Sequence, residues 1–178
     1  MARALRDFGL AQGAWFAAVL GAAAGQPLWS VLAAARVLLV QVCWPAAGAA
    51  RGAGLIRVLA IAAAGTAVDG VWAACGWLGL RDPALPAWQL WAWLFGLWLS
   101  FATTLGSALA CLAPRPLLAV LVGGVCGPLA WLGGERLGAV RLTTPPTVSL
   151  VAQGLAWGLG LPLMLAVVVP RRVPEAAA

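Results

Sequence analysis

The chain has 178 residues, of which 63% are hydrophobic and only 9% are charged, and its formal net charge is +6. Soluble domains carry about 25% charged residues, so this chain could not cover the surface of a soluble fold of its size. The arginines stand singly or in pairs between apolar runs, which is typical of topology signals in a membrane protein and not of a nucleic-acid surface. The absence of histidine excludes histidine general bases and histidine-ligated zinc or iron.

The apolar runs are long enough to cross a bilayer, because a membrane helix needs about 20 apolar residues. A Gly-Gln-Pro turn separates the first two runs, and a Pro-Arg-Pro break separates the fourth from the fifth. The sequence therefore predicts an all-α, polytopic transmembrane bundle of six helices, which forms a single domain over residues 1–178. The predicted spans are 8–25, 28–45, 57–80, 88–113, 117–133 and 148–169.

The arginines also predict the orientation of the chain. If the spans alternate in direction, seven arginines fall on the side of the N-terminus, three fall on the other side, and Arg36 lies inside a span. The positive-inside rule then places both termini in the cytoplasm and the multi-pass chain in the inner membrane. An alternative is that the first span is a cleaved signal peptide, because Arg3 and Arg6 precede an apolar run that ends in small residues.

Small residues recur on one face of several predicted spans. In the first span a small residue stands at every fourth position from residue 9 to residue 25, where it would let a neighbouring helix backbone approach closely. This spacing favours a retained helix over a leader. The same spacing recurs in the fifth span. We expect close helix packing at Gly9, Gly13, Gly21, Gly25, Gly123, Gly127 and Pro128.

Two ionisable residues, Arg36 and Asp69, fall in the middle of predicted spans. A charge at the bilayer centre costs about 3 kcal/mol on insertion scales, so it is seldom left unpaired. Because the second and third spans are sequential and antiparallel, an Arg36–Asp69 ion pair is geometrically reasonable. The pair could fix helix register, or Asp69 could be a site for a proton, an ion or a head group. The residues of this candidate intramembrane polar site are Arg36, Asp69, Thr103, Thr104 and Gln153.

Tryptophan and cysteine give weaker signals. Tryptophans near span ends predict an interfacial belt, whereas deeper ones such as Trp98 and Trp157 are expected to pack or to line a cavity. The four cysteines form no C-x-x-C pair, and we expect them to be small buried apolar side chains, with a redox or metal role as the alternative. We predict no catalytic, cofactor-binding or metal-binding residue.

Several blocks of the chain carry a family resemblance. The most specific are Phe-Ala-Thr-Thr at residues 101–104 and Gly-Pro-Leu at residues 127–129, and the others are Gln12–Phe16, Val68–Gly70, Leu97–Leu105, Arg115–Leu118 and Gly127–Val140. In these residues the chain resembles the domain-of-unknown-function 2878 family of small bacterial inner-membrane proteins. The resemblance implies a multi-span membrane protein without an assigned activity. Genes of this family often lie beside those of cyclopropane-fatty-acid-synthase-like enzymes and oxidoreductases, which implies a role in membrane lipid modification or envelope stress.

These observations favour a non-enzymatic accessory protein that binds membrane lipids, a lipid-modifying enzyme or a second copy of itself. One alternative is a small transporter or channel with Asp69 at a mid-membrane site, although a comparison of the first three spans with the last three shows only a weak repeat. Another alternative is a membrane-embedded lipid-modifying enzyme, for which no nucleophile–base pair is visible. No cofactor and no nucleic-acid partner are expected.

Overall fold

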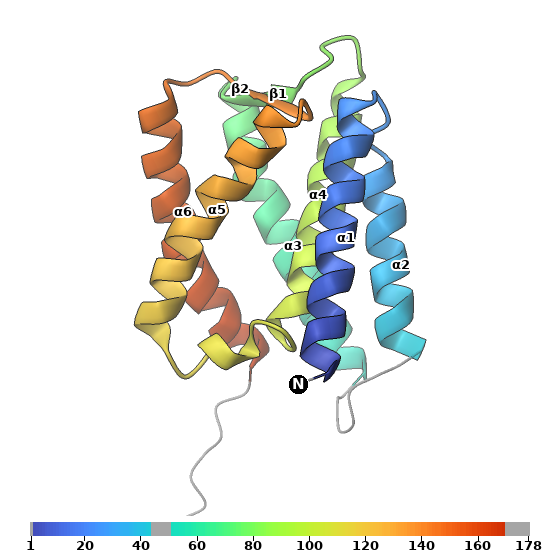
Figure 1. Cartoon of the computed structure of the whole chain (residues 1–178), viewed down its shortest axis with the longest axis vertical. Helices are drawn as coiled ribbons and strands as arrows, with labels where there is room; N and C mark the ends of the chain where they lie inside the picture. Colours follow the sequence, from blue (N-terminus) through green and yellow to red (C-terminus); the bar gives the residue numbers. More distant parts are fainter. Residues whose placement is uncertain (1, 44–50, 170–178) are drawn as a thin grey trace, which may run out of the picture.

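The computed structural model describes residues 2–43 and 51–169, which form a bundle of six helices (Figure 1). The predicted all-α bundle is therefore confirmed. The first helix begins and the last helix ends at the same end of the bundle, and a pair of short strands caps the other end, called the strand end below (Figure 1). The helices are α1 (Ala2–Ala23), α2 (Trp29–Cys43), α3 (Arg51–Ala74), α4 (Ala87–Leu105), α5 (Pro116–Arg136) and α6 (Pro146–Val168), with the 3-10 helix η1 (Ala110–Leu112) and the strands β1 (Leu78–Leu80) and β2 (Val140–Leu142).

Two predicted spans extend well past the ends of the helices that form. The third ends at Ala74, because Gly76 follows with a φ of 74° and such a residue terminates a helix. The fourth ends at Leu105, where the weak helix formers Gly106 and Ser107 follow. Residues 44 and 45 of the second predicted span lie outside the described residues.

Three helices are long and apolar enough to cross a membrane, within the described part of the chain: Gly54–Ala74 of α3, Pro116–Arg136 of α5 and Thr147–Val168 of α6. The apolar helix α2 is shorter, with 15 residues. α1, α2 and α4 run alongside the three long helices in the same bundle (Figure 1). Six helices are thus confirmed, whereas six membrane crossings stay a prediction.

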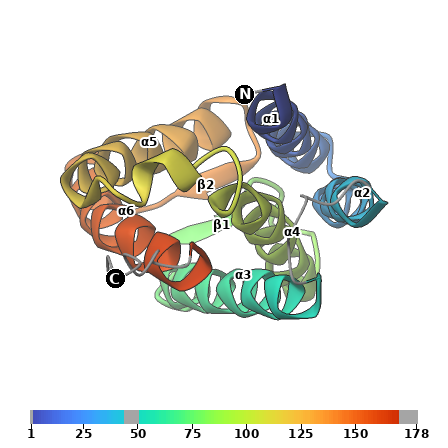
Figure 2. The same cartoon turned by 90° about the horizontal axis from the view of Figure 1, so that it is seen from below.

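Helix α4 is the centre of one half of the bundle. It packs against α1, α2 and α3, while α5 and α6 pack against each other (Figure 2). Three of its apolar side chains, Trp93, Leu94 and Leu105, are among the largest fully buried ones in the described residues, and Trp93 and Leu94 are 1% and 0% exposed. The indole Nε1 of Trp93 donates to the carbonyl of Ala18 at 2.9 Å, which fixes α1 against α4.

The two strands reveal a local two-fold axis at the strand end. β1 pairs with β2 antiparallel, and the pair Gly79–Arg141 lies at its centre. The hydrogen bonds that flank the ladder match each other: Arg81 N donates to Ala139 O at 3.0 Å, and Thr143 N donates to Trp77 O at 3.2 Å. Gly76 and Gly138, with φ of 74° and 84°, end the preceding helices in the same way.

The same symmetry continues into the helices. The ring of Trp98 on α4 lies against Gly65 on α3, and the ring of Trp157 on α6 lies against Gly127 on α5. The two indoles stack on each other across the axis, with centroids 4.7 Å apart and planes 5° from parallel. The units α3–β1–α4 and α5–β2–α6 are therefore structural equivalents. The repeat is one of two helices and not the three-span repeat that the sequence comparison sought.

Candidate functional site

Asp69 is the most deeply buried ionisable group within the predicted spans. It lies on the face of α3 that also carries Gly65, and only 3% of the residue is exposed. The indole Nε1 of Trp98 donates to its Oδ2 at 2.6 Å. Because the missing side chain of Gly65 leaves room for the indole, the ring reaches the carboxylate one turn further along α3. Asp69 thus faces inward as predicted, and its partner is an indole.

The predicted Arg36–Asp69 ion pair is wrong. Helix α4 lies between α2 and α3, so helices that are consecutive in sequence are separated in space (Figure 2). Asp69 faces α4, whereas Arg36 lies on the exposed surface of α2. The salt bridge found among the described residues joins Arg6 to Asp7 at 2.7 Å.

The other predicted polar residues do not gather around Asp69. Thr103 and Thr104 stand at the end of α4 that is remote from the strands, and their hydroxyls donate to carbonyls of α4 itself, those of Ser100 and Phe101, at 2.7 Å each. The side chain of Gln41 joins α2 to α4 here, because its Nε2 donates to Thr103 O at 3.3 Å. The threonine hydroxyls are therefore satisfied within α4, and the Gln41 bond holds two helices together.

Gln153 lies nearer to the level of Asp69 in the bundle than Thr103 and Thr104 do. It is 4% exposed and stands one turn before Trp157 on α6, and Trp157 stacks on the indole that binds Asp69. The structure thus brings Asp69, Trp98 and Trp157 to the contact between the two repeat units, and Gln153 is buried one turn from Trp157. The equivalence of Trp98 and Trp157 was the signal that sequence reasoning missed, since the two units share few identical residues.

An open groove lies between α1 and α2. Its volume is about 440 Å³, and its lining residues are Gly9, Leu10, Gly13, Ala14, Ala17, Trp29, Leu32, Ala33, Arg36 and Val37. The expected close packing at Gly9 and Gly13 is wrong, because a β-carbon at either residue would have no atom within 4 Å. The stripe of small residues on α1 instead forms one wall of the groove. Arg36 is the groove's charged residue.

The other predicted packing residues have defined neighbours, with one exception. Gly25 is exposed and adopts a φ of 73°, so its role is in the turn between α1 and α2. Gly21 does face the start of α2, where a β-carbon would lie 2.8 Å from Cβ of Trp29. Gly123, Gly127 and Pro128 are buried in the α5–α6 contact, as predicted.

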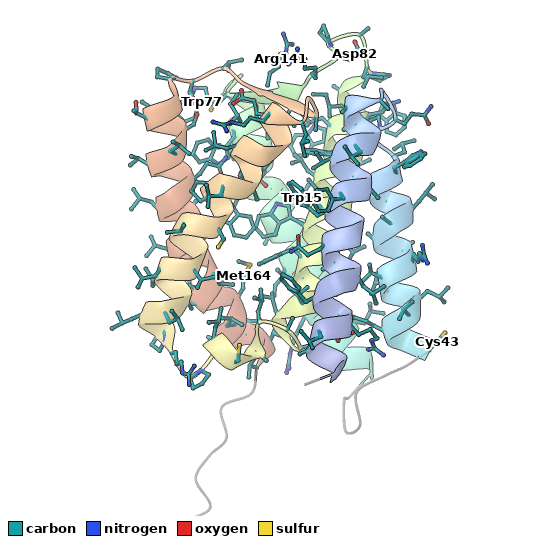
Figure 3. The ribbon with its side chains drawn as sticks, in the orientation of Figure 1. Trp15, Cys43, Trp77, Asp82, Arg141 and Met164 are labelled. Atoms are coloured by element: carbon teal, nitrogen blue, oxygen red, sulfur yellow. The ribbon has the colours of Figure 1, made fainter. Side chains whose placement is uncertain are left out.

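Figure 3 shows which side chains lie at the two ends of the bundle. Trp77, Asp82 and Arg141 lie at the strand end, whereas Cys43 lies at the opposite end, and Trp15 and Met164 point between the helices (Figure 3). Cys43 and the other three cysteines, Cys75, Cys111 and Cys126, are exposed on the bundle surface, so their predicted burial is wrong. Within the described residues, no group of three Cys, Asp or Glu side chains is placed to hold a metal ion.

The fold and these surfaces define a helical bundle with three helices that can span a membrane, a closed polar contact at Asp69, and a groove open to the side. The chain belongs to the family described as Protein of unknown function (DUF2878), which matches residues 4–163. No curated protein and no solved structure matches it.

Proposed function

We propose that this protein is a non-enzymatic accessory protein of the bacterial inner membrane that holds an anionic phospholipid in the α1–α2 groove. Its termini lie in the cytoplasm, and it serves membrane lipid modification or the response to envelope stress. The observation that carries the proposal is the cation of Arg36 in a groove whose other lining residues are uncharged. In the described part of the chain, Arg36 has no carboxylate partner.

The groove matches a phospholipid in both shape and chemistry. Leu10, Leu32 and Val37 offer apolar walls for an acyl chain, and the small residues of α1 leave space for it. A guanidinium binds phosphate oxygens through two parallel hydrogen bonds, which makes arginine well suited to a lipid phosphate. Anionic lipid therefore supplies the charge that a lone arginine at this depth requires.

The length of α2 brings the phosphate within reach. The 15 residues that the structure describes in α2 span about 22 Å at 1.5 Å per residue, which is less than the hydrocarbon core of about 30 Å. A short helix thins the bilayer around it, and long basic side chains extend toward the head groups. Trp29, which begins α2 and is 52% exposed, lies at the end of the groove where an interfacial indole belongs.

Replacing Arg36 tests this proposal. The full-length chain, extracted in mild detergent, is examined by native mass spectrometry after incubation with phosphatidylglycerol or phosphatidylcholine. We expect Arg36→Gln to retain about fivefold less phosphatidylglycerol, since one basic residue near a membrane surface contributes about 1 kcal/mol. Phosphatidylcholine retention should stay unchanged.

Arg57→Gln is the matched control, because Arg57 is an exposed arginine on α3 that does not line the groove. Equal retention of phosphatidylglycerol by wild type and Arg36→Gln would contradict lipid binding at the groove. Lipid profiles of cells with and without the gene then test the link to lipid modification: unchanged profiles would argue for a role outside lipid chemistry.

A second candidate function is a small proton or ion transporter, and the burial of Asp69 at the contact between two equivalent units favours it. Intramembrane carboxylates at repeat interfaces commonly mark ion paths. We expect Asp69→Asn to abolish proton flux into phosphatidylcholine vesicles that contain the full chain, as measured with an internal pH-sensitive dye. Asparagine keeps an oxygen that accepts from Trp98, so the variant should insert and fold. Flux that is absent in wild type, or unaltered in the variant, would remove Asp69 from this role.

A further inference from the structure

The α1–α2 hairpin covers only one of the two equivalent units of the bundle. On the first unit, α2 lies directly on α4: a β-carbon at Gly96 would lie 2.6 Å from the backbone carbon of Ser30. Further along α2, Ala34 joins a buried cluster with Ala62 and Leu99 of the first unit. Helix α2 thus occupies a defined seat on α4, at the side where α4 borders Ala62 of α3.

The second unit has a groove at the equivalent position, with side chains of different size, and no described residue covers it. The local two-fold axis, extended from Gly65 and Gly127 and from Trp98 and Trp157, gives the equivalent positions. On α5, the equivalents of Val58 and Ala62 are Val120 and Gly124, at the spacing that relates Gly65 to Gly127. On α6, the equivalents of Phe95, Gly96 and Leu99 are Gly154, Leu155 and Gly158, at the spacing that relates Trp98 to Trp157. All five of these α5 and α6 residues line a groove of about 270 Å³, together with Leu121, Val125 and Leu159.

We propose that this α5–α6 groove seats one transmembrane helix of a partner protein, in the way that α2 sits on α4. The occupant is inferred from what fills the equivalent seat, which is a membrane helix. Helices α2 and α4 both start at the strand end, so they run in the same direction (Figure 1). Since α6 is the equivalent of α4, the partner helix should run in the direction of α6. The proposal concerns a different surface and a different ligand from the lipid groove, so each can fail without the other.

The sizes of the side chains in the α5–α6 groove predict which residues the partner helix needs at its docking face. Where Ser30 of α2 meets Gly96, the partner meets Leu155, so it needs a small residue there. Where Ala34 packs in one cluster with Ala62 and Leu99, the partner meets Gly124 and Gly158, so it needs a large apolar residue. The partner helix therefore carries glycine, alanine or serine four residues before leucine or phenylalanine on the face that docks.

Two synthetic single-span peptides test the order of these residues. Both are built on the α2 sequence, lengthened with leucine at each end and carrying Arg36→Leu. The matching peptide has Ala34→Leu and the reversed peptide has Ser30→Leu, and a diazirine replaces part of the leucine side chain that was introduced. Each peptide is mixed with the full chain in phosphatidylcholine vesicles and illuminated, and mass spectrometry maps the adducts.

The matching peptide should form adducts at Leu155 and Leu159 and not at Val71, although Leu155 and Val71 are both 63% exposed. We expect Gly124→Leu, which fills the groove, to lower these adducts about fivefold, the effect of losing one packing contact. Gly160→Leu is the control, because Gly160 does not line the groove and its nearest atom is the flexible Cε of Met164 at 3.6 Å. Gly124→Ala, whose β-carbon would make only ordinary contacts, serves if the leucine variant fails to fold.

Three results would overturn the proposal. Adducts that follow exposure alone, with Val71 labelled as strongly as Leu155, would make the groove ordinary lipid-facing surface. Equal labelling by the matching and reversed peptides would show that the groove does not discriminate between peptides by the order of small and large residues. A dimer of the full chain in the same vesicles, trapped by a chemical crosslinker, together with no adduct of either peptide at Leu155, would make this face an interface between copies instead.

Discussion

Trp98→Ala should lower the free energy of unfolding by about 4 kcal/mol, since truncating a buried tryptophan leaves a cavity and removes its apolar contacts. Trp98 is 8% exposed and fills the space over Gly65. The substitution also removes the stack on Trp157 and the donor to Asp69. A buried carboxylate without its hydrogen bond adds to the loss. The measurement is denaturant unfolding of the full chain in detergent micelles, followed by circular dichroism.

Trp91→Ala is the matched control for Trp98→Ala. Trp91 stands on the same helix and lies against a glycine of α3, Gly70, but it is 45% exposed. Its truncation should therefore cost less than half as much. Adding Asp69→Leu to Trp98→Ala should recover part of the loss, because it removes the carboxylate that has lost its donor. Equal effects of Trp98→Ala and Trp91→Ala would mean that the indole–carboxylate contact does not organise the bundle.

Gly65→Ala and Gly127→Ala should each destabilise the protein by about 2 kcal/mol or more, because overpacking a filled contact forces side chains and backbone to shift. At each position the new methyl group would overlap the indole on the neighbouring helix, Trp98 or Trp157. Since the two glycines are equivalent under the two-fold axis, we expect similar losses in the same unfolding measurement. The near-ultraviolet dichroism of the stacked indoles should also change, because both substitutions displace a ring of that pair.

Gly13→Ala provides the contrast. A β-carbon there would meet no atom within 4 Å, and alanine favours a helix over glycine by up to about 1 kcal/mol. This substitution should leave the protein unchanged or slightly more stable. Destabilisation by Gly13→Ala equal to that by Gly65→Ala would contradict the assignment of Gly13 to an open groove.

The helices themselves could be predicted because the information for them is local. Long apolar runs bounded by glycine, proline and arginine mark where a helix starts and ends, so the number of helices is confirmed. The strands β1 and β2 were missed, since each has only three residues and its pairing depends on a partner far along the chain. The two-helix repeat was missed for the same reason: its units share a geometry at Gly76 and Gly138 more than they share residues.

The candidate site was predicted in part. The sequence singled out Asp69 as an unusual charge in an apolar run, and its burial is seen. Its partner was not predictable, because an ion pair with Arg36 assumed that consecutive helices pack together. Helix α4 takes the place between α2 and α3, and its indole reaches the carboxylate first. The same small-residue spacing occurs at Gly127, which is in close contact with Trp157, and at Gly13, which has no atom near its β-carbon position. The spacing alone therefore does not predict whether another helix packs there.

By itself the sequence determined the apolar character of the chain, its helical class and the approximate position of each helix, because these follow from composition and short-range backbone preferences. Only the tertiary structure decided which helices are neighbours, that Trp98 joins Asp69, and that Arg36 is left on a groove. The physical reason is that packing depends on how two side-chain surfaces fit together. That fit belongs to pairs of segments distant in the chain, so no single segment contains it.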